Sequence, residues 1–98
     1  MSWKDTYHPK AAKAILNLAV DLKLRDKIRS SIAAILADPY AHGKPKAGPL
    51  KGCRATAFTH ARVAYRIVYE IDKPSGMIYV LSVAKHDSAY DDASRRRP

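Results

Sequence analysis

Residues 62–85 read RVAYRIVYEIDKPSGMIYVLSVAK, two apolar stretches joined by the polar sequence KPSG. Pro74 suits the first central position of a type I turn, and Gly76 suits the left-handed residue that follows such a turn in three-residue hairpin loops. The stretch therefore predicts two antiparallel strands in which Lys73 lies opposite Met77.

This pairing gives the hairpin, with strands 62–72 and 77–85, two unlike faces. The apolar face combines Tyr65, Ile67, Tyr69 and Ile71 with Tyr79, Leu81 and Val83. The opposite face is smaller and more polar, and it carries Arg66 about one diagonal from His86. A slip of one residue would move a whole strand to the other face, so the hydrophobic pattern supports this register. We expect the apolar face to carry the helices, and Arg66 and His86 to share the other face.

Two amphipathic helices are expected before the hairpin. Pro9 is suited to the first turn of a helix, where its missing N–H costs nothing. Apolar residues then recur at helical spacing, as Ala11, Ile15, Leu18 and Leu22 in the first helix and as Ile28, Ile32, Ile35 and Leu36 in the second. Asp38 ends the second helix, because a residue before proline disfavours the helical conformation. The two helices are expected to form an antiparallel hairpin.

The remaining segments complete an α+β fold in one domain, residues 1–98. A short strand is expected at 3–7, a long loop at 39–52 and a strand at 53–59. Asp87 can cap a short C-terminal helix that contains Tyr90. The predicted architecture is an N-terminal α-helical hairpin packed on a twisted antiparallel sheet, with a short C-terminal helix and a mobile basic tail at residues 94–98.

The charge of the chain favours a polyanionic partner. Eighteen Lys and Arg residues against nine Asp and Glu residues give a net charge of +9. No carboxylate lies between Asp38 and Glu70, although many basic residues do. The sequence contains no run of about 18 apolar residues, so no membrane span is predicted. Cys53 is the only cysteine, which favours a reducing, cytoplasmic setting.

The basic and titratable residues match what RNA cleavage by side chains alone would need. One group must remove a proton from the 2′-hydroxyl, cations must stabilise the phosphate, and another group must protonate the leaving oxygen. The candidate proton carriers are His60, His86 and Tyr90, and the candidate cations are Lys44, Lys46, Lys51, Arg54, Arg62, Arg66 and Lys85. Each could instead be a solvated or packing side chain. No metal-ligand cluster, phosphate-binding glycine loop or serine elbow is found, so no metal or cofactor is expected.

Four segments of the chain resemble the RelE/ParE family of toxins from bacterial type II toxin–antitoxin systems. They are YHPKAAKAILNL, ADPYAHGKPKAGPLKG, VAYRIVYEID and VLSVAKHDSAY, in that order. The resemblance implies a cognate antitoxin as partner and one of two activities. RelE-like members cleave mRNA on the ribosome, and ParE-like members inhibit DNA gyrase without catalysis.

The RelE pattern assigns roles to particular positions. It places Arg66 on the phosphate, His86 at the basic position after the last strand, and Tyr90 at the terminal tyrosine. His86 stands where many RelE-like members have arginine, and the spacing to Tyr90 is shorter than in the best-known pattern. Because Arg66, His86 and Tyr90 together can move protons and bind phosphate, the sequence favours the ribonuclease over the gyrase inhibitor. A plain nucleic-acid-binding domain is a third alternative.

Overall fold

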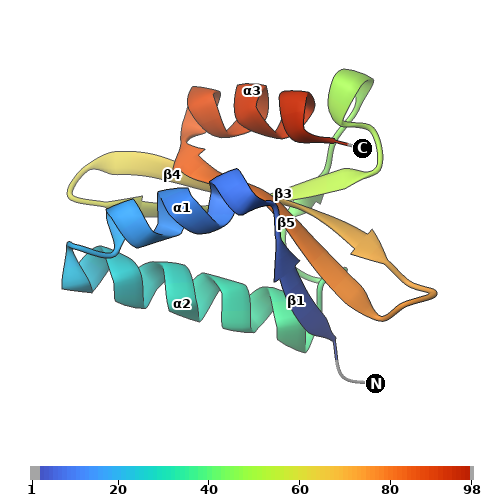
Figure 1. Ribbon diagram of the computed structural model, residues 1–98, viewed down its shortest axis with the longest axis horizontal. Helices are drawn as coiled ribbons and strands as arrows, with labels where there is room; N and C mark the ends of the chain where they lie inside the picture. The colour runs from blue at the N-terminus through green and yellow to red at the C-terminus, as the bar shows by residue number, and fades with distance from the viewer. Residues whose placement is uncertain (1–2, 98) are drawn as a thin grey trace.

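The structure of the protein is a computed structural model that describes residues 3–97, apart from the side chain of Asp87. Helices lie on both faces of a central sheet (Figure 1). The elements are β1 (Lys4–Tyr7), α1 (Pro9–Leu18), α2 (Leu22–Ala37), β2 (Lys44–Pro45), a 3₁₀ turn (Gly48–Leu50), β3 (Cys53–His60), β4 (Val63–Asp72), β5 (Met77–Lys85) and α3 (His86–Arg96). No helix in the described range is long and apolar enough to cross a membrane. The α+β fold expected from the sequence is confirmed.

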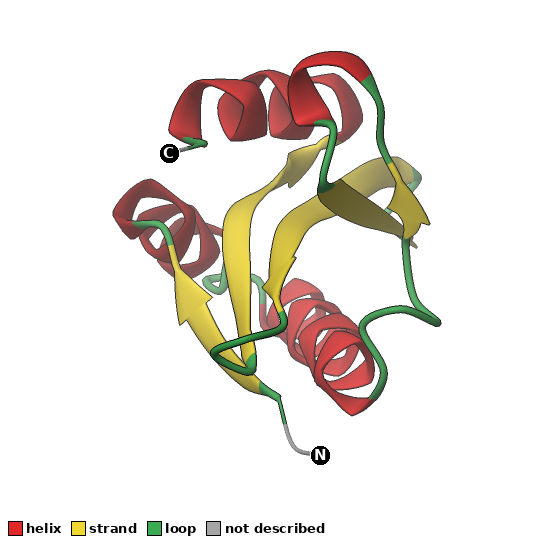
Figure 2. Cartoon of the chain, turned by 90° about the vertical axis from the view of Figure 1, so that its right-hand side faces the viewer, coloured by secondary structure: helices red, strands yellow, loops and turns green. Residues whose placement is uncertain are grey.

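The sheet is mixed, whereas the sequence predicted an antiparallel one. Its strand order is β1-β5-β4-β3-β2. The four strands β2 to β5 pair antiparallel, but β1 runs parallel to β5, with Lys4 opposite Met77 and Tyr7 opposite Val80. Strands β1 and β2 form the two opposite edges of the sheet, and α1 and α2 connect them across one face. Figure 2 shows α3 on one side of the sheet and the α1–α2 hairpin on the other.

The predicted register of the β4–β5 hairpin is correct in one half and wrong in the other. Arg66 lies opposite Ala84, as predicted, but Asp72 rather than Lys73 lies opposite Met77. The loop thus has four residues, 73–76, and Gly76 adopts the expected left-handed conformation, with φ of 70°. An irregularity beside the Val68–Tyr69 step, where β5 carries one extra residue, joins the two registers.

The prediction that Leu81 lies on the face toward the helical hairpin is wrong because of this bulge. Leu81 packs instead with Ala89 and Ala93 of α3, whereas Val80 and Val83 face α1 and α2. An extra residue in one strand shifts the alternation of side chains by one position, so the predicted face is right on one side of the bulge only.

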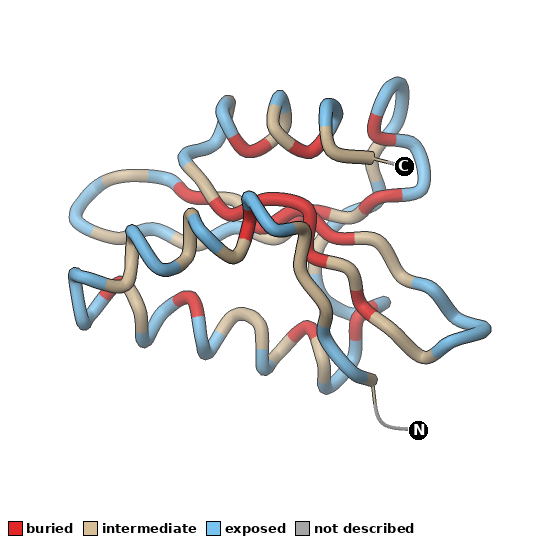
Figure 3. The backbone as a smooth tube through the Cα atoms, in the orientation of Figure 1, coloured by how far each residue is buried: buried red, intermediate tan, exposed pale blue. Residues whose placement is uncertain are grey.

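Each face of the sheet has its own hydrophobic core, and the most buried residues follow the central strands (Figure 3). The core under the hairpin includes Ile28 and Ile35 of α2, which are 2% and 1% exposed, together with Tyr69 at 0%. The core under α3 includes Leu81 and Cys53, both nearly fully buried. Burial raises the pKa of the Cys53 thiol to about 12, with a smaller effect from the Glu70 carboxylate, so the thiol is a neutral packing group.

The helix boundaries differ from the prediction at one place. Leu22 begins α2 and is exposed, so it does not belong to the apolar stripe of α1. Asp21 separates the helices because its carboxylate accepts hydrogen bonds from the backbone N–H groups of Lys23 and Leu24 at 3.1 and 3.2 Å. The end of α2 at Ala37, before Asp38 and its proline, is as predicted.

The C-terminal segment is folded, so the prediction of a mobile basic tail at 94–98 is wrong for residues 94–97. Helix α3 begins at His86, which places Asp87 in the first turn rather than at the cap, and it continues to Arg96. The Arg96 guanidinium donates to the Leu81 carbonyl at 2.9 Å, and that of Arg97 contacts the Glu70 carboxylate at 2.7 Å. Arginines that bond to the sheet hold the helix end in place. Residue 98 lies outside the described range.

Candidate functional site

A cavity of about 520 Å³ opens between the loop after α2, the strands β2 to β4 and the start of α3. Its lining is mixed polar and apolar and consists of Ala41, Gly43, Lys44, Lys46, Ala55, Thr56, Ala57, Arg66, His86 and Tyr90. We call this the basic groove. Five of the residues singled out in the sequence, namely Lys44, Lys46, Arg66, His86 and Tyr90, therefore line one site.

Tyr90 is electrostatically the most perturbed side chain of the basic groove. Partial burial acts to raise the pKa of its phenol, but hydrogen bonds and charge from Lys46 and Arg66 outweigh burial and lower the pKa below its ordinary value. The Lys46 ammonium also lies 4.9 Å from the centre of the Tyr90 ring. Two cations, Lys46 just after β2 and Arg66 in β4, thus favour the phenolate form of a tyrosine on α3.

His86 and Tyr90 present two proton-carrying rings side by side. Their ring centres are 4.9 Å apart, with planes at 77°, in an edge-to-face arrangement. The two residues are four positions apart at the beginning of α3, so one helical turn brings them to the same face. Arg66 projects from β4 towards the same groove, and its guanidinium donates to the carbonyl of Tyr65 at 3.2 Å. The sequence prediction that Arg66 and His86 share a face is confirmed.

The loop that carries the groove lysines is fixed by Tyr69 of the core and by Arg54, a role that the sequence analysis did not predict for either residue. The Tyr69 hydroxyl contacts the carbonyl oxygens of Pro39 at 2.8 Å and His42 at 2.5 Å. The Arg54 guanidinium donates to the carbonyls of Tyr40 at 2.8 Å and Gly43 at 3.1 Å. These bonds satisfy the carbonyls of the loop and hold it in place where β2 begins.

Gly43 is required where this loop crosses the sheet. Its φ is 71°, and a Cβ atom there would lie 2.9 Å from the Tyr69 hydroxyl oxygen and 3.0 Å from the Ala55 carbonyl oxygen. A glycine in a loop between a helix and a basic strand is the sequence signal that could have indicated this close approach.

His60 is not part of the basic groove. It ends β3, and strand alternation puts its side chain on the face of the helical hairpin, opposite to Arg66. Its Nε2 lies 2.9 Å from the Asp21 carboxylate, and its side chain is only 13% exposed. His60 therefore links the end of β3 to the N-terminal cap of α2.

The other predicted RNA contacts fall outside the groove lining. Arg54 is engaged by the loop carbonyls, as described above. Arg62 is exposed in the tight β3–β4 turn, where it has a φ of 65°. Lys51 and Lys85 are exposed, the first after the 3₁₀ turn and the second at the cap of α3. Contacts of these residues with a long polyanion remain a prediction.

The sequence model of one family matches residues 6–94, and that family is described as the ParE-like toxin of type II bacterial toxin–antitoxin systems. The match spans nearly all the described elements, from β1 into α3. The chain belongs to the ParE-like toxins. No curated protein matches this ParE-like toxin in sequence.

Solved structures that resemble this ParE-like toxin are RelE proteins. A free, doubly arginine-substituted RelE toxin of E. coli aligns with a TM-score of 0.80 and 20% identity, with all of both chains covered. The RelBE2 toxin–antitoxin complex of Mycobacterium tuberculosis gives a TM-score of 0.72 and 19% identity over 88% of this chain and 100% of that one. The intact E. coli RelBE complex gives 0.68 and 21% over 87% and 98%. These likenesses show a shared fold.

The ParE-like toxin also has an apolar cavity, of about 630 Å³, along the helical hairpin. It is lined mainly by side chains of α1 and α2, including Ile15, Leu16, Ile32 and Leu36. Leu16 is 73% exposed. Between residues 3 and 97, no three described His, Cys, Asp or Glu side chains form a group that could hold a metal ion.

Proposed function

We propose that this toxin is an endoribonuclease that cleaves mRNA on the ribosome with the side chains of the basic groove. The observation that carries the proposal is the convergence of three cations, a phenol with a lowered pKa and an imidazole in one cavity. The groups needed for in-line attack of a 2′-hydroxyl on the neighbouring phosphate are the same ones: a base, cations and an acid.

In the proposed reaction Tyr90 is the general base. Its phenolate accepts the proton of the 2′-hydroxyl while the 2′-oxygen bonds to phosphorus, because Lys46 and Arg66 favour the deprotonated phenol. Arg66 and Lys46 also donate to the non-bridging phosphate oxygens, where negative charge builds up in the transition state. The bond from phosphorus to the 5′-oxygen then breaks. The products are a 2′,3′-cyclic phosphate and a 5′-hydroxyl.

His86 is proposed as the general acid that protonates the leaving 5′-oxygen. An imidazole can donate and accept protons near neutral pH, and this one lies next to the Tyr90 ring at the groove. Lys44 is proposed to bind the RNA backbone beside the reacting phosphate. His60 has no role in this scheme, because it lies on the other face of the sheet.

The family match favours gyrase inhibition as a second candidate, since the resemblance implies that activity for ParE-like members. One experiment separates the two. Purified toxin is added to a translation reaction with a defined mRNA, the 5′ ends are mapped by primer extension, and gyrase supercoiling is assayed in parallel. We expect new 5′ ends that require ribosomes and unaffected supercoiling. Intact transcripts together with blocked supercoiling would replace the first candidate with the second.

We further propose that a cognate antitoxin binds this protein, as expected of a type II toxin. The solved complexes RelBE2 and RelBE are toxin–antitoxin assemblies with the same fold on the toxin side. The apolar cavity along α1 and α2 supplies a surface for such a partner, and exposed Leu16 and Val20 lie on this hairpin. Co-purification of the toxin with the product of the adjacent gene tests this. A Leu16→Asp variant that co-purifies as well as the wild type would exclude the hairpin surface.

A further inference from the structure

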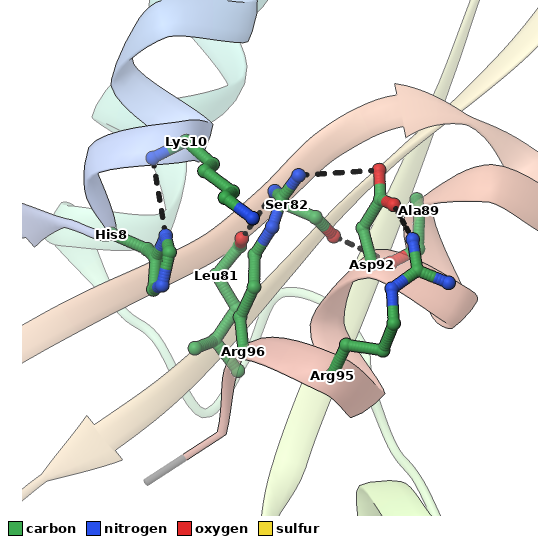
Figure 4. A network of polar contacts seen from close by, with 8 residues as sticks. All are labelled: His8, Lys10, Leu81, Ser82, Ala89, Asp92, Arg95 and Arg96. Carbon is green, nitrogen blue, oxygen red and sulfur yellow. Dashed lines mark hydrogen bonds and ion pairs between the residues drawn. The ribbon is translucent and has the colours of Figure 1, made fainter.

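Two consecutive side chains of β5, Leu81 and Ser82, face α3. Neighbouring residues of a regular strand point to opposite faces, so the extra residue of the β5 bulge is what allows this. Leu81 packs against Ala89 and Ala93, and the Ser82 hydroxyl donates to the Ala89 carbonyl at 2.6 Å (Figure 4). The bulge therefore leaves Leu81 and the Ser82 hydroxyl next to each other against the helix that carries the groove rings.

Ser82 is the one fully buried polar residue of the described chain, with 0% exposure. Burying a hydroxyl group is unfavourable unless the group is hydrogen-bonded. An alanine would fill most of the same space in an otherwise apolar strand at no such cost. The hydroxyl is satisfied by one partner, the carbonyl of Ala89, and that partner belongs to α3. The Ser82 hydroxyl thus contributes to the placement of α3.

The apolar contact between α3 and the sheet does little to set how the helix is turned about its axis. Its buried residues, Ala89 and Ala93, are both 0% exposed and too small to interlock with the strands. Polar bonds from the bulge supply the missing constraint, because the Leu81 carbonyl also accepts from Arg96 at 2.9 Å (Figure 4). The bulge thereby holds α3 at two points that are about two helical turns apart.

We propose that Ser82 is a positioning residue for Tyr90, which acts by fixing the rotation of α3 so that the phenol meets Lys46 and Arg66. Ala89 immediately precedes Tyr90, so a bond to the Ala89 carbonyl constrains the helix at the point where the phenol leaves it. The consequence of this placement for RNA cleavage rests on the proposed function. The placement itself does not.

The test compares Ser82→Ala and Ser82→Cys with a matched control, Val80→Ala. Val80 lies on the same strand but packs in the core under the helical hairpin, so its truncation destabilises the protein without touching α3. Cysteine keeps the shape of serine with a slightly larger atom and a weaker S–H donor. The first readout is the titration of Tyr90, followed by NMR of protein with labelled tyrosine rings, in which Tyr90→Phe identifies the signal.

We expect Ser82→Ala to raise the pKa of Tyr90 towards the ordinary value, Ser82→Cys to raise it less, and Val80→Ala to leave it unchanged. A Tyr90 titration in Ser82→Ala that matches the wild type would overturn the proposal, as would an equal shift in Val80→Ala. If Ser82→Ala does not fold, Ser82→Cys decides, since a wild-type titration in that variant together with full cleavage excludes a positioning role.

The second readout is cleavage at saturating substrate. We expect Ser82→Ala to lower the maximal rate by roughly 10- to 100-fold with unchanged RNA affinity, because a misplacement of about 1 Å can cost about 100-fold. A loss of affinity without a loss of rate would contradict the proposal. If the wild type does not cleave RNA at all, the proposed function fails, while the Tyr90 titration still decides the role of Ser82.

Discussion

The Lys46 ammonium lies over the Tyr90 ring, 4.9 Å from its centre. Lys46 follows the two-residue strand β2, and Tyr90 is in α3, so the contact joins the loop after the helical hairpin to the last helix of the chain. Cations near a ring face are attracted by its quadrupole, and a cation near the phenol oxygen favours its deprotonation. This contact and the Arg66 guanidinium are what distinguish Tyr90 from an ordinary surface tyrosine.

Substitution of Arg66 by alanine should abolish cleavage while leaving the fold intact. Arg66 is only partly buried, and its guanidinium bonds to the Tyr65 carbonyl and to the Tyr90 phenol, so little packing is lost. Loss of a preorganised donor to a developing negative charge costs about 2.7–4 kcal/mol in the barrier, or roughly 100- to 1000-fold in rate. Primer extension gives the rate and circular dichroism the fold. An unfolded variant would show that Arg66 is structural.

Tyr90→Phe should lower cleavage by about 100-fold or more, since general base catalysis contributes about 10²- to 10⁴-fold. The ring, and thus its packing against His86, is retained. Tyr40→Phe is the control, because Tyr40 is 51% exposed and outside the groove lining. Full activity of Tyr90→Phe in single-turnover cleavage would remove the phenol from the mechanism.

The pH dependence of cleavage should report the phenol. In the proposed reaction the phenolate is the base and the His86 imidazolium is the acid, so the rate should be bell-shaped in pH, and one limb should be set by the pKa of Tyr90, which lies below the ordinary 10.0. Lys46→Met removes a cation that lowers this pKa, so the limb set by Tyr90 should move to higher pH. Lys44→Met removes a groove lysine that does not act on Tyr90 and should leave the limb in place. Rates at saturating RNA across a pH series check both; superimposable profiles would exclude Tyr90 as the base.

Gly43→Ala should destabilise the protein more than Gly76→Ala, although both positions have a φ near 70°. A left-handed alanine costs about 1–2 kcal/mol at either site. Only at Gly43 does the new methyl group also meet the Tyr69 hydroxyl and the Ala55 carbonyl, which adds about 1–3 kcal/mol for overpacking. Urea unfolding gives the two free energies of unfolding. Equal losses would mean that the loop can move away from the sheet without cost.

Arg97→Ala should lower the free energy of unfolding by about 1–2 kcal/mol, after allowance for partial exposure of the pair. Its guanidinium bonds to the Glu70 carboxylate at 2.7 Å and to the Pro49 carbonyl at 3.0 Å. Arg95→Ala is the matched control, because Arg95 is 71% exposed and pairs only with Asp92, and it should cost less than about 0.5 kcal/mol. Equal melting temperatures of the two variants would show that the end of α3 is not held by Arg97.

The fold was predictable from periodicity and turn chemistry, but two features were not. Apolar spacing and Pro39 located α1 and α2, and the KPSG turn located the β4–β5 hairpin. The parallel place of β1 depends on which edge of the sheet is free once the helices are packed, and no local pattern encodes that. The β5 bulge is also a tertiary feature, because it brings Leu81 and Ser82 to the same face of the sheet, where α3 packs.

The candidate site was predictable where strand register controls it. Pairing across the hairpin placed Arg66 beside the start of α3, and helical spacing joined His86 to Tyr90. Charge alone could not separate Lys46, which reaches the groove, from Arg54, which bonds to loop carbonyls. His60 was misplaced because a sequence shows that a histidine ends a strand but not which carboxylate lies across from it.

The parallel pairing of β1 with β5 sets an order of events during synthesis. Strand β1, Lys4–Tyr7, finds its partner only after residues 77–80 have left the ribosome. Helices α1 and α2 share a core with the same strand, β5, and Tyr90 is translated later still. Contacts so distant in sequence form late. A nascent chain thus cannot assemble the basic groove until α3 has been translated.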